Sequence, residues 1–243
     1  MPPPRFTTLL VDLDGTLLDI EMRGFLEAFF PLAAARFGGP GEAPRITEAL
    51  GAAARAMSDA LDGARRVDHV FLESFAPAVG RPAGQVREMF SSFYRGEFES
   101  LRRLARPVPG ARAFVERALG LGCQLVLATN PVFFLDAICA RVRWAGLSAV
   151  PSFFALVTGA ELMCWTKPHA AYYRQILDMI GRRPEECLMV GDDPRMDMAA
   201  KKAGIATWLA VHGDGAPRNT PLADRWGTLE QLAAWLEKSG PRR

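Results

Sequence analysis

The sequence predicts an α/β fold, with a mainly parallel sheet and a helical domain inserted after the first strand. Two patterns support this prediction. Beyond residue 106, short apolar runs of strand length alternate with segments whose apolar residues recur at helical spacing. This alternation is typical of parallel strands whose connecting helices cover both faces of the sheet. A further apolar run, at residues 7–10, stands far upstream, so the residues between are predicted to be an insertion.

The insertion is predicted to be helical throughout. Its apolar residues, such as Phe25, Phe29 and Leu32, recur at helical spacing, and stretches rich in glycine or proline separate the helices. We expect helices at residues 23–37, 46–61, 67–79 and 83–104. The proline-containing stretch 106–110 marks the return to the sheet domain. The predicted domains are therefore a core of residues 1–19 and 106–243 and a helical domain of residues 20–105.

The core region is predicted element by element from the same periodicities. Expected strands lie at residues 124–128, 154–158, 187–190 and 206–209. Expected helices lie at residues 111–119, 131–144, 169–180, 195–203 and 229–237.

Composition restricts the class of protein. The 243 residues carry a net charge of +2, which is too small to indicate binding to nucleic acid or to an anionic membrane surface. No apolar run approaches the length of a membrane-spanning helix, and the N-terminus lacks the pattern of a signal peptide. The cysteines Cys123, Cys139, Cys164 and Cys187 show no close pairing. We therefore expect a cytoplasmic protein with reduced core cysteines.

The most informative motif follows the first predicted strand. The run Val11-Asp12-Leu13-Asp14-Gly15-Thr16 places two carboxylates two residues apart where the strand ends at a glycine. One acid can attack phosphorus to form an aspartyl-phosphate, while the other moves protons. An ordinary strand-to-turn exit uses the same residue types, so the motif needs support from elsewhere in the chain.

Further polar groups follow other predicted strands, at the edge where parallel sheets bind ligands. Thr129 and Asn130 precede Pro131, where they can bind a phosphate oxygen or merely cap a helix. Lys167 comes just before another helix, and alone it would be assigned to the surface. The carboxylates in Gly191-Asp192-Asp193-Pro194-Arg195-Met196-Asp197 repel one another unless a cation offsets their charge. This last group predicts a site for a hard cation such as Mg²⁺.

Together these segments resemble the haloacid dehalogenase superfamily of hydrolases. Its motifs occur here in the same order: a DxDGT strand end, a Ser or Thr after the second strand, a lysine, and GDxxxxD. The resemblance covers residues 6–18 and 107–210, and it implies a Rossmann-like sheet. It also implies that the helical insertion is the α-helical cap of that superfamily.

The resemblance implies a role for each motif residue. Asp12 matches the nucleophile, and Asp14 matches the general acid–base whose backbone carbonyl also binds Mg²⁺. Thr129, helped by Asn130, matches the phosphoryl-binding residue, and Lys167 matches the cation that neutralises the nucleophile and the phosphate. The metal set implied is Asp12, Asp14 and Asp192, with Asp193 and Asp197 in support.

The function expected is that of a Mg²⁺-dependent phosphatase for a small phosphorylated metabolite, most similar to phosphoglycolate phosphatases. Asp14 favours this activity over a dehalogenase, because a halide leaving group needs no proton. A phosphomutase with the same acids stays open, and a non-catalytic Mg²⁺- and phosphate-binding module is a further alternative. No motif identifies the substrate or the oligomeric state. Arg23, Arg55, Arg65 and Tyr94 are candidates for contact with an anionic substrate, although a solvated helix face is the simpler assignment for each.

Overall fold

The computed structural model describes residues 6–39, 41–59, 63–147, 153–212 and 223–239. Within them, six parallel strands form one sheet in the order β5-β4-β1-β6-β7-β8. The strands are β1 (Thr8–Val11), β4 (Gln124–Leu127), β5 (Leu156–Val157), β6 (Cys187–Gly191), β7 (Ala206–Ala210) and β8 (Arg225–Gly227). The predicted α/β class and its parallel sheet are confirmed.

β1 occupies the middle of the sheet, where all four of its residues are buried. Leu9 lies opposite Leu125 of β4 on one side and Leu188 of β6 on the other. A strand that pairs on both edges and is covered on both faces consists of consecutive apolar residues. This is why the sequence predicted β1 as a strand.

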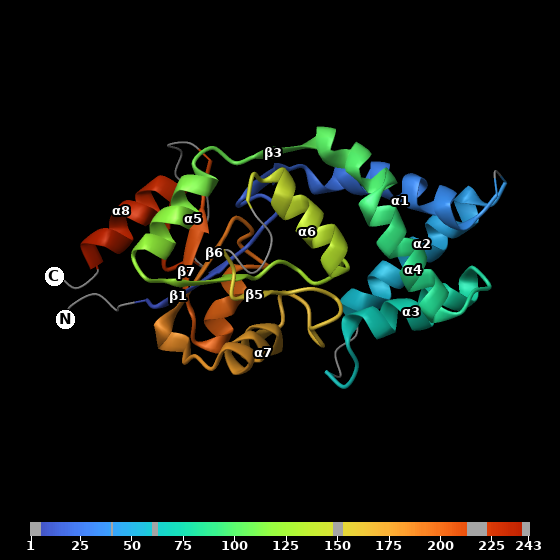
Figure 1. Cartoon of the computed structure of the whole chain (residues 1–243). Coiled ribbons are helices and arrows are strands. Elements are labelled where there is room, and N and C mark those ends of the chain that lie inside the picture. Colours follow the sequence, from blue (N-terminus) through green and yellow to red (C-terminus); the bar gives the residue numbers. More distant parts are fainter. Residues whose placement is uncertain (1–5, 40, 60–62, 148–152, 213–222, 240–243) are drawn as a thin grey trace.

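Helices cover the sheet on both faces (Figure 1). α5 (Ala111–Gly120) packs against α8 (Leu229–Ser239) on one face, and α7 (Ala170–Ile180) lies on the opposite face. α6 (Leu135–Trp144) follows β4, and the 3-10 helix η3 (Met198–Ala203) packs against α7 and β7. A second 3-10 turn, η2 (Pro184–Glu186), leads into β6.

The helical insertion leaves and rejoins the core through a short ribbon. β2 (Leu18–Ile20) pairs antiparallel with β3 (Ala105–Pro107), so the two crossings run side by side. Between them lie α1 (Met22–Phe37), α2 (Ala43–Asp59), α3 (Val67–Ala78), α4 (Ala83–Arg95) and the 3-10 helix η1 (Glu97–Leu104). Phenylalanine rings fill the space between these helices; for example, the ring centroids of Phe37 and Phe75 are 5.1 Å apart. The predicted insertion of helices is confirmed.

The structure corrects several element boundaries. The single helix expected at residues 83–104 breaks at Gly96, which favours helix poorly, and continues as η1. The helix expected at 131–144 begins only at Leu135, because the Glu161 carboxylate accepts the Leu135 N–H at 3.0 Å and caps the helix there. The segment 195–203 contributes only the 3-10 helix η3. The end of the helix expected at 46–61 lies outside the described residues.

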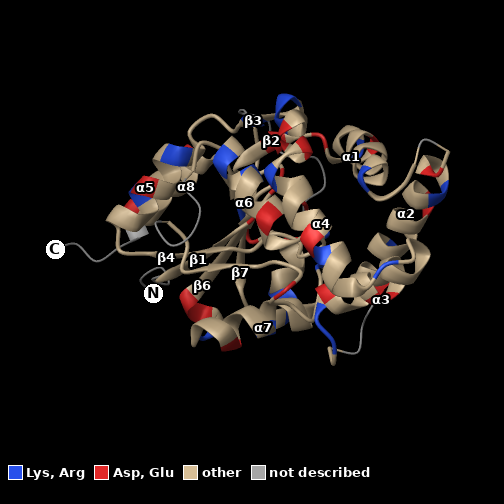
Figure 2. Ribbon diagram, turned by 45° about the vertical axis from the view of Figure 1, so that its right-hand side comes forward, with Lys and Arg blue, Asp and Glu red and all other residues tan. Residues whose placement is uncertain are grey.

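Other features of the sequence analysis can be placed on the same structure. Cys123 and Cys187 are buried, whereas Cys139 and Cys164 are only half-buried, so the expectation of core cysteines holds for two of the four. Basic and acidic residues are interspersed along the helices (Figure 2). No helix in the described part of the chain has the length and apolar character needed to cross a membrane.

Candidate active site

The predicted site residues converge at the carboxyl-terminal edge of the sheet. β1 lies between β4 and β6 with all three parallel, so the loops that follow them meet at one place. A cavity of about 840 Å³ lies there between the core and the inserted helices. It is lined by all of the predicted site residues, namely Asp12, Asp14, Thr129, Asn130, Lys167, Asp192, Asp193 and Asp197.

A buried ion-pair cluster holds the first of these acids. Lys167 Nζ donates to Asp12 Oδ1 at 2.7 Å and to Asp197 Oδ1 at 2.5 Å, and all three residues are buried. Burial disfavours the charged ammonium, but the two carboxylates outweigh it and raise the pKa of Lys167 well above its ordinary value. Lys167 is therefore a fixed positive charge that positions one oxygen of Asp12.

The carboxylates around this ammonium are too many for it to neutralise. Oxygens of Asp12, Asp192 and Asp197 lie within 4.8 Å of one another. Burial, reinforced by repulsion between the acids, raises the pKa of Asp12 and Asp192 to about 6 and that of Asp197 to about 7. A hard divalent cation would supply additional positive charge, lower these raised pKa values and favour the ionised form of all three acids.

Two of the clustered acids keep an oxygen available for such a cation. Thr16 Oγ1 donates to Asp192 Oδ1 at 3.0 Å, and Lys167 takes Oδ1 of Asp12, while the Oδ2 atoms of both acids accept no hydrogen bond from the described residues. Asp197 has both oxygens engaged, because its Oδ2 accepts the Asp193 N–H at 3.0 Å. The donor set therefore fits Mg²⁺ beside Asp12 and Asp192, while Asp197 anchors Lys167.

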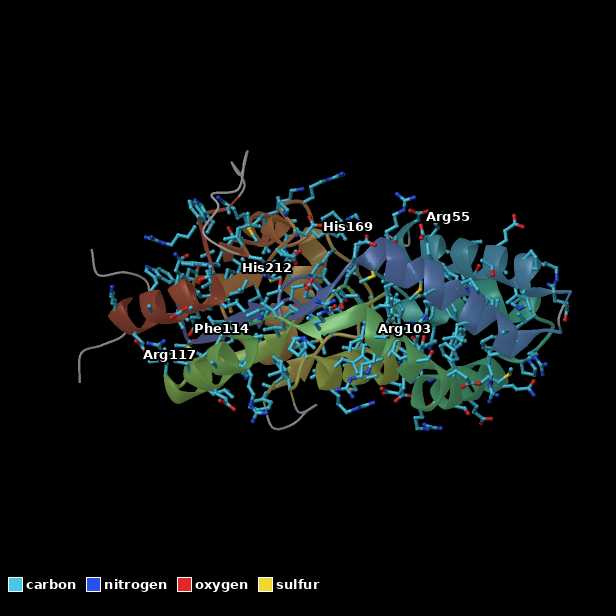
Figure 3. All side chains as sticks on the ribbon, turned by 90° about the horizontal axis from the view of Figure 1, so that it is seen from above. Arg55, Arg103, Phe114, Arg117, His169 and His212 are labelled. Atoms are coloured by element: carbon cyan, nitrogen blue, oxygen red, sulfur yellow. The ribbon has the colours of Figure 1, made fainter. Side chains whose placement is uncertain are left out.

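Glycines make this crowding possible. Gly15 has φ +85°, a backbone conformation that favours glycine, and a Cβ there would overlap the Asp192 carboxylate. A Cβ on Gly191 would likewise overlap the carboxylate of Asp197. His212 (Figure 3) follows β7, and its Nε2 donates to the Gly15 carbonyl at 2.7 Å, which ties the first motif loop to a neighbouring loop.

Asp193 stabilises the turn after β6. Its Oδ1 accepts the backbone N–H groups of Arg195 at 2.7 Å and Met196 at 2.9 Å. These bonds orient the Asp193 carboxylate toward its own loop, in an arrangement characteristic of Asp in turns.

Hydrogen bonds to its backbone fix the loop after β4, and its side chains line the cavity. The carbonyl of Thr129 accepts from Thr158 Oγ1 at 2.7 Å and from the Tyr172 hydroxyl at 2.8 Å. The Thr129 hydroxyl itself makes no hydrogen bond with any described residue. Asn130 Oδ1 accepts the backbone N–H of Lys167 at 3.2 Å, which links the second motif to the third.

Arg141 is a site residue that the sequence reasoning missed. It lies on α6, is 1 % exposed, and its Nη1 donates to Asp14 Oδ2 at 2.5 Å. Its guanidinium also lies over the ring of Phe133, at 4.4 Å from the centroid. Burial raises the pKa of Asp14, and the charge of Arg141 opposes that shift. A signal was present, since Arg141 falls one helical turn after the apolar Ala137 and Ile138, on the face that becomes buried.

Within this ion pair several polar atoms lack partners. Asp14 Oδ1 and the Nε and Nη2 atoms of Arg141 are buried and have no hydrogen bond among the described residues. The Asp14 carboxylate is therefore held by one strong contact from the core, rather than by the cluster around Lys167.

The candidate substrate contacts from the inserted helices separate into two groups. Arg55 and Tyr94 line the cavity. Arg23 instead pairs with Glu27 at 3.1 Å on the surface, and Arg65 pairs with Glu73 at 2.7 Å.

Comparison with known families agrees with this geometry. Residues 6–204 match the family model described as haloacid dehalogenase-like hydrolase. The chain belongs to that hydrolase family. The match spans the sheet through β6, the inserted helices and every motif residue named above.

Named relatives of this hydrolase are phosphatases. A phosphoserine phosphatase from Thermus thermophilus is 31% identical, over 83% of this chain and 87% of that protein. A phosphoglycolate phosphatase from Xylella fastidiosa is 25% identical, over 95% of this chain and 91% of that protein. Among solved structures, CbbY from Rhodobacter sphaeroides in complex with phosphate matches with a TM-score of 0.59 at 20% identity, covering 93% of this chain and 96% of that chain. L-2-haloacid dehalogenase from Xanthobacter autotrophicus matches with a TM-score of 0.57 at 18% identity, covering 96% and 98%. These structural likenesses establish the shared fold.

The Arg141–Asp14 contact predicts strong energetic coupling in this hydrolase. Arg141→Met leaves the half-buried Asp14 carboxylate without its cation and is expected to lower the free energy of unfolding by about 1–3 kcal/mol. The double variant with Asp14→Asn should lose less than the sum of the two single variants, by at least about 1 kcal/mol. Urea unfolding of the four proteins measures this coupling.

Arg143→Met is the matched control, because Arg143 lies on the same helix but is 54% exposed in its pair with Glu99. Its unfolding free energy should change by no more than about 0.5 kcal/mol. Strict additivity of the Arg141 and Asp14 variants would show that the two side chains do not interact.

Proposed function

We propose that this hydrolase is a Mg²⁺-dependent phosphatase that acts on a phosphomonoester through an aspartyl-phosphate on Asp12. The observation that carries the proposal is the buried contact of Asp12 with Lys167. It engages one carboxylate oxygen of a side chain that lines the cavity and leaves the other oxygen without a hydrogen bond from the described residues. The named phosphatases among its relatives support the same activity. The substrate's organic group is not identified by these relatives, whose names differ in their substrates.

Each site residue has a place in the proposed reaction. Asp12 Oδ2 attacks phosphorus, the bond from phosphorus to the alcohol oxygen breaks, and the Asp14 carboxyl donates its proton to that oxygen. Asp14 then accepts a proton from the water that attacks the aspartyl-phosphate, and the bond from phosphorus to Asp12 breaks. This sequence releases inorganic phosphate and restores both acids.

Charge neutralisation and positioning fall to the remaining residues. Lys167 offsets the negative charge of Asp12 and of the incoming phosphate, and the Thr129 hydroxyl and Asn130 amide bind phosphoryl oxygens. Asp192, the backbone carbonyl of Asp14 and the Asp12 oxygen that does not attack phosphorus would hold Mg²⁺, since Oδ1 of Asp12 has an acceptor direction beyond the one that Lys167 uses. The ion would supply further positive charge to the phosphoryl group. Asp193 and Asp197 support the loop and Lys167.

We also propose that the chain divides into domains at the β2–β3 ribbon, with residues 20–105 as a cap over a core of residues 1–19 and 106–243. The cavity lies between these two parts, so the cap is placed to exclude water while Asp12 attacks. The presence of Asp14 beside Asp12 supports phosphatase chemistry over dehalogenation, because an alcohol leaving group needs a proton.

The nucleophile assignment predicts that Asp12→Asn abolishes phosphate release while the protein stays folded. The amide keeps the size of the side chain but is not an attacking oxyanion. Release of inorganic phosphate from acetyl phosphate is the measurement. Asp19→Asn, at an exposed acid in β2, is the control that should keep full activity. More than a few per cent of wild-type turnover by Asp12→Asn would refute the assignment.

The metal assignment predicts loss of activity with a chelator and its return with Mg²⁺. It also predicts that Mg²⁺ raises the thermal unfolding midpoint of the wild type, because a ligand that binds only the folded state stabilises it. Asp192→Ala should remove this thermal shift, whereas Asp19→Asn should retain it. Full turnover after exhaustive metal removal, or an unchanged thermal shift in Asp192→Ala, would contradict the site.

A further inference from the structure

We propose that the alcohol part of the substrate is an apolar group, aromatic or a longer alkyl chain, that binds in an aromatic pocket above Asp12. This inference rests on the proposed phosphatase function and specifies its substrate class. It departs from the carboxylate-bearing substrates, phosphoglycolate and phosphoserine, in the names of the relatives.

The cavity is much larger than a phosphate site requires. Its volume of about 840 Å³ lies within the range of about 300–1,000 Å³ typical of pockets for drug-sized ligands. Asp12, Thr129 and Lys167 line its core side, so a phosphate bound there directs its ester group toward the inserted helices. A two-carbon acid such as glycolate would leave most of this space unfilled.

The walls toward the inserted helices are aromatic. Rings reach the cavity from α1, α3 and α4 and from the loop after β4, and they include Phe30, Phe71, Phe90, Tyr94, Phe133 and Phe134. These rings contact one another across the two parts of the chain. The centroids of Phe71 and Phe134 are 5.6 Å apart, and those of Phe90 and Phe134 are 5.5 Å apart. Clustered rings at such distances offer stacking and edge contacts to an apolar guest.

Cations for a substrate carboxylate are scarce in this cavity. Besides Lys167, Arg55 is the only Lys or Arg among its described lining residues, and it is an exposed residue of α2 (Figure 3). The lining also includes the acids Glu21 and Asp59. Away from Arg55, a carboxylate enclosed by these aromatic walls would have no cation beside it and would be costly to bind.

The cations nearest the aromatic walls are already paired. Arg87 lies over the Phe134 ring, but its guanidinium donates to Asp68 at 3.2 Å and to Glu161 at 3.0 Å. Arg141, over the Phe133 ring, pairs with Asp14. Neither arginine lines the cavity.

Tyr94 supplies a neutral polar contact within these walls. It is 3% exposed, lines the cavity, and its hydroxyl makes no hydrogen bond with any described residue. Burial raises the pKa of this phenol, so it stays neutral. A neutral hydroxyl can bond an ether, carbonyl or hydroxyl oxygen of an otherwise apolar substrate, and it gives a carboxylate no countercharge.

The test compares alkyl phosphates that differ in the polarity of the alcohol. The substrates are 2-phenylethyl phosphate, pentyl phosphate, 5-phosphonooxypentanoate, phosphoglycolate and phosphoserine, with wild-type enzyme and Mg²⁺. We expect kcat/KM for 2-phenylethyl phosphate to exceed that for phosphoglycolate and phosphoserine at least about tenfold. Pentyl phosphate should exceed its carboxylate-ended counterpart by a similar factor. Equal or higher efficiency on the carboxylate-bearing substrates would overturn the proposal.

Acetyl phosphate separates failure of this inference from failure of the phosphatase assignment. Its small, activated leaving group needs little from the pocket. Hydrolysis of acetyl phosphate together with a preference for carboxylate-bearing esters would contradict only the proposed substrate class. If the folded protein with Mg²⁺ hydrolysed none of these phosphates, the phosphatase assignment itself would be contradicted.

Substitutions in the wall test the pocket directly. Phe30 is a half-buried wall residue, and Phe30→Ala should lower the kcat/KM ratio of 2-phenylethyl phosphate to acetyl phosphate about tenfold. Phe153 is also half-buried but does not line the cavity, so Phe153→Ala should leave that ratio within about twofold of wild type. Thermal unfolding checks that both variants fold. An unchanged ratio in folded Phe30→Ala would contradict the pocket, and the wild-type comparison stands without either variant.

Discussion

The buried contact between the Lys167 ammonium and the Asp12 carboxylate is the interaction on which the rest of the site depends. Lys167 is only 4% exposed, so its ammonium needs anionic partners, and Asp12 and Asp197 provide them at hydrogen-bond distance. The pair fixes one oxygen of Asp12 and leaves the other toward the cavity. It also brings the acids together, where burial and their mutual repulsion raise their pKa values. The proposed metal ion and the proposed nucleophile are thus two consequences of one arrangement of charge.

The sheet topology makes this arrangement possible. Placing β1 between β4 and β6 brings residues as distant in sequence as Asp12 and Asp197 to one edge. Glycines at positions 15 and 191 then allow the loops to approach more closely than any side chain would permit. The inserted helices close the other side of the cavity with phenylalanine rings. The charged side chains come from the core, whereas the apolar wall comes mostly from the inserted helices, with Phe133 and Phe134 added by the loop after β4. Chemistry and substrate choice can therefore vary largely independently in such an enzyme.

The sequence predicted the parallel sheet, the helical insertion and the polar residues at the carboxyl-terminal edge of the sheet, because each depends on local patterns. Buried strands such as β1 are continuous apolar runs, and motif acids follow strands directly. Contacts between distant segments left no such pattern. The sequence placed Arg141 on the apolar face of a helix, but it did not indicate the partner Asp14, which lies 127 positions away. The three-residue strands β2 and β3 were too short for any periodicity, and the capping of α6 by Glu161 depends on a later loop. The same limit applied to the aromatic walls, whose rings come from three helices and a loop that are distant in the sequence.

Chemical trapping of the phosphoenzyme tests the central claim most directly. Wild-type enzyme turning over acetyl phosphate with Mg²⁺ would be quenched in acid, treated with borohydride to reduce any acyl phosphate, and digested with trypsin. The peptide of residues 6–23 contains both Asp12 and Asp14, and tandem mass spectrometry distinguishes them. The account predicts conversion of Asp12 to homoserine, dependent on substrate. Conversion of Asp14 or of an acid elsewhere in the chain would contradict the account, as would turnover that leaves every carboxyl group unreduced.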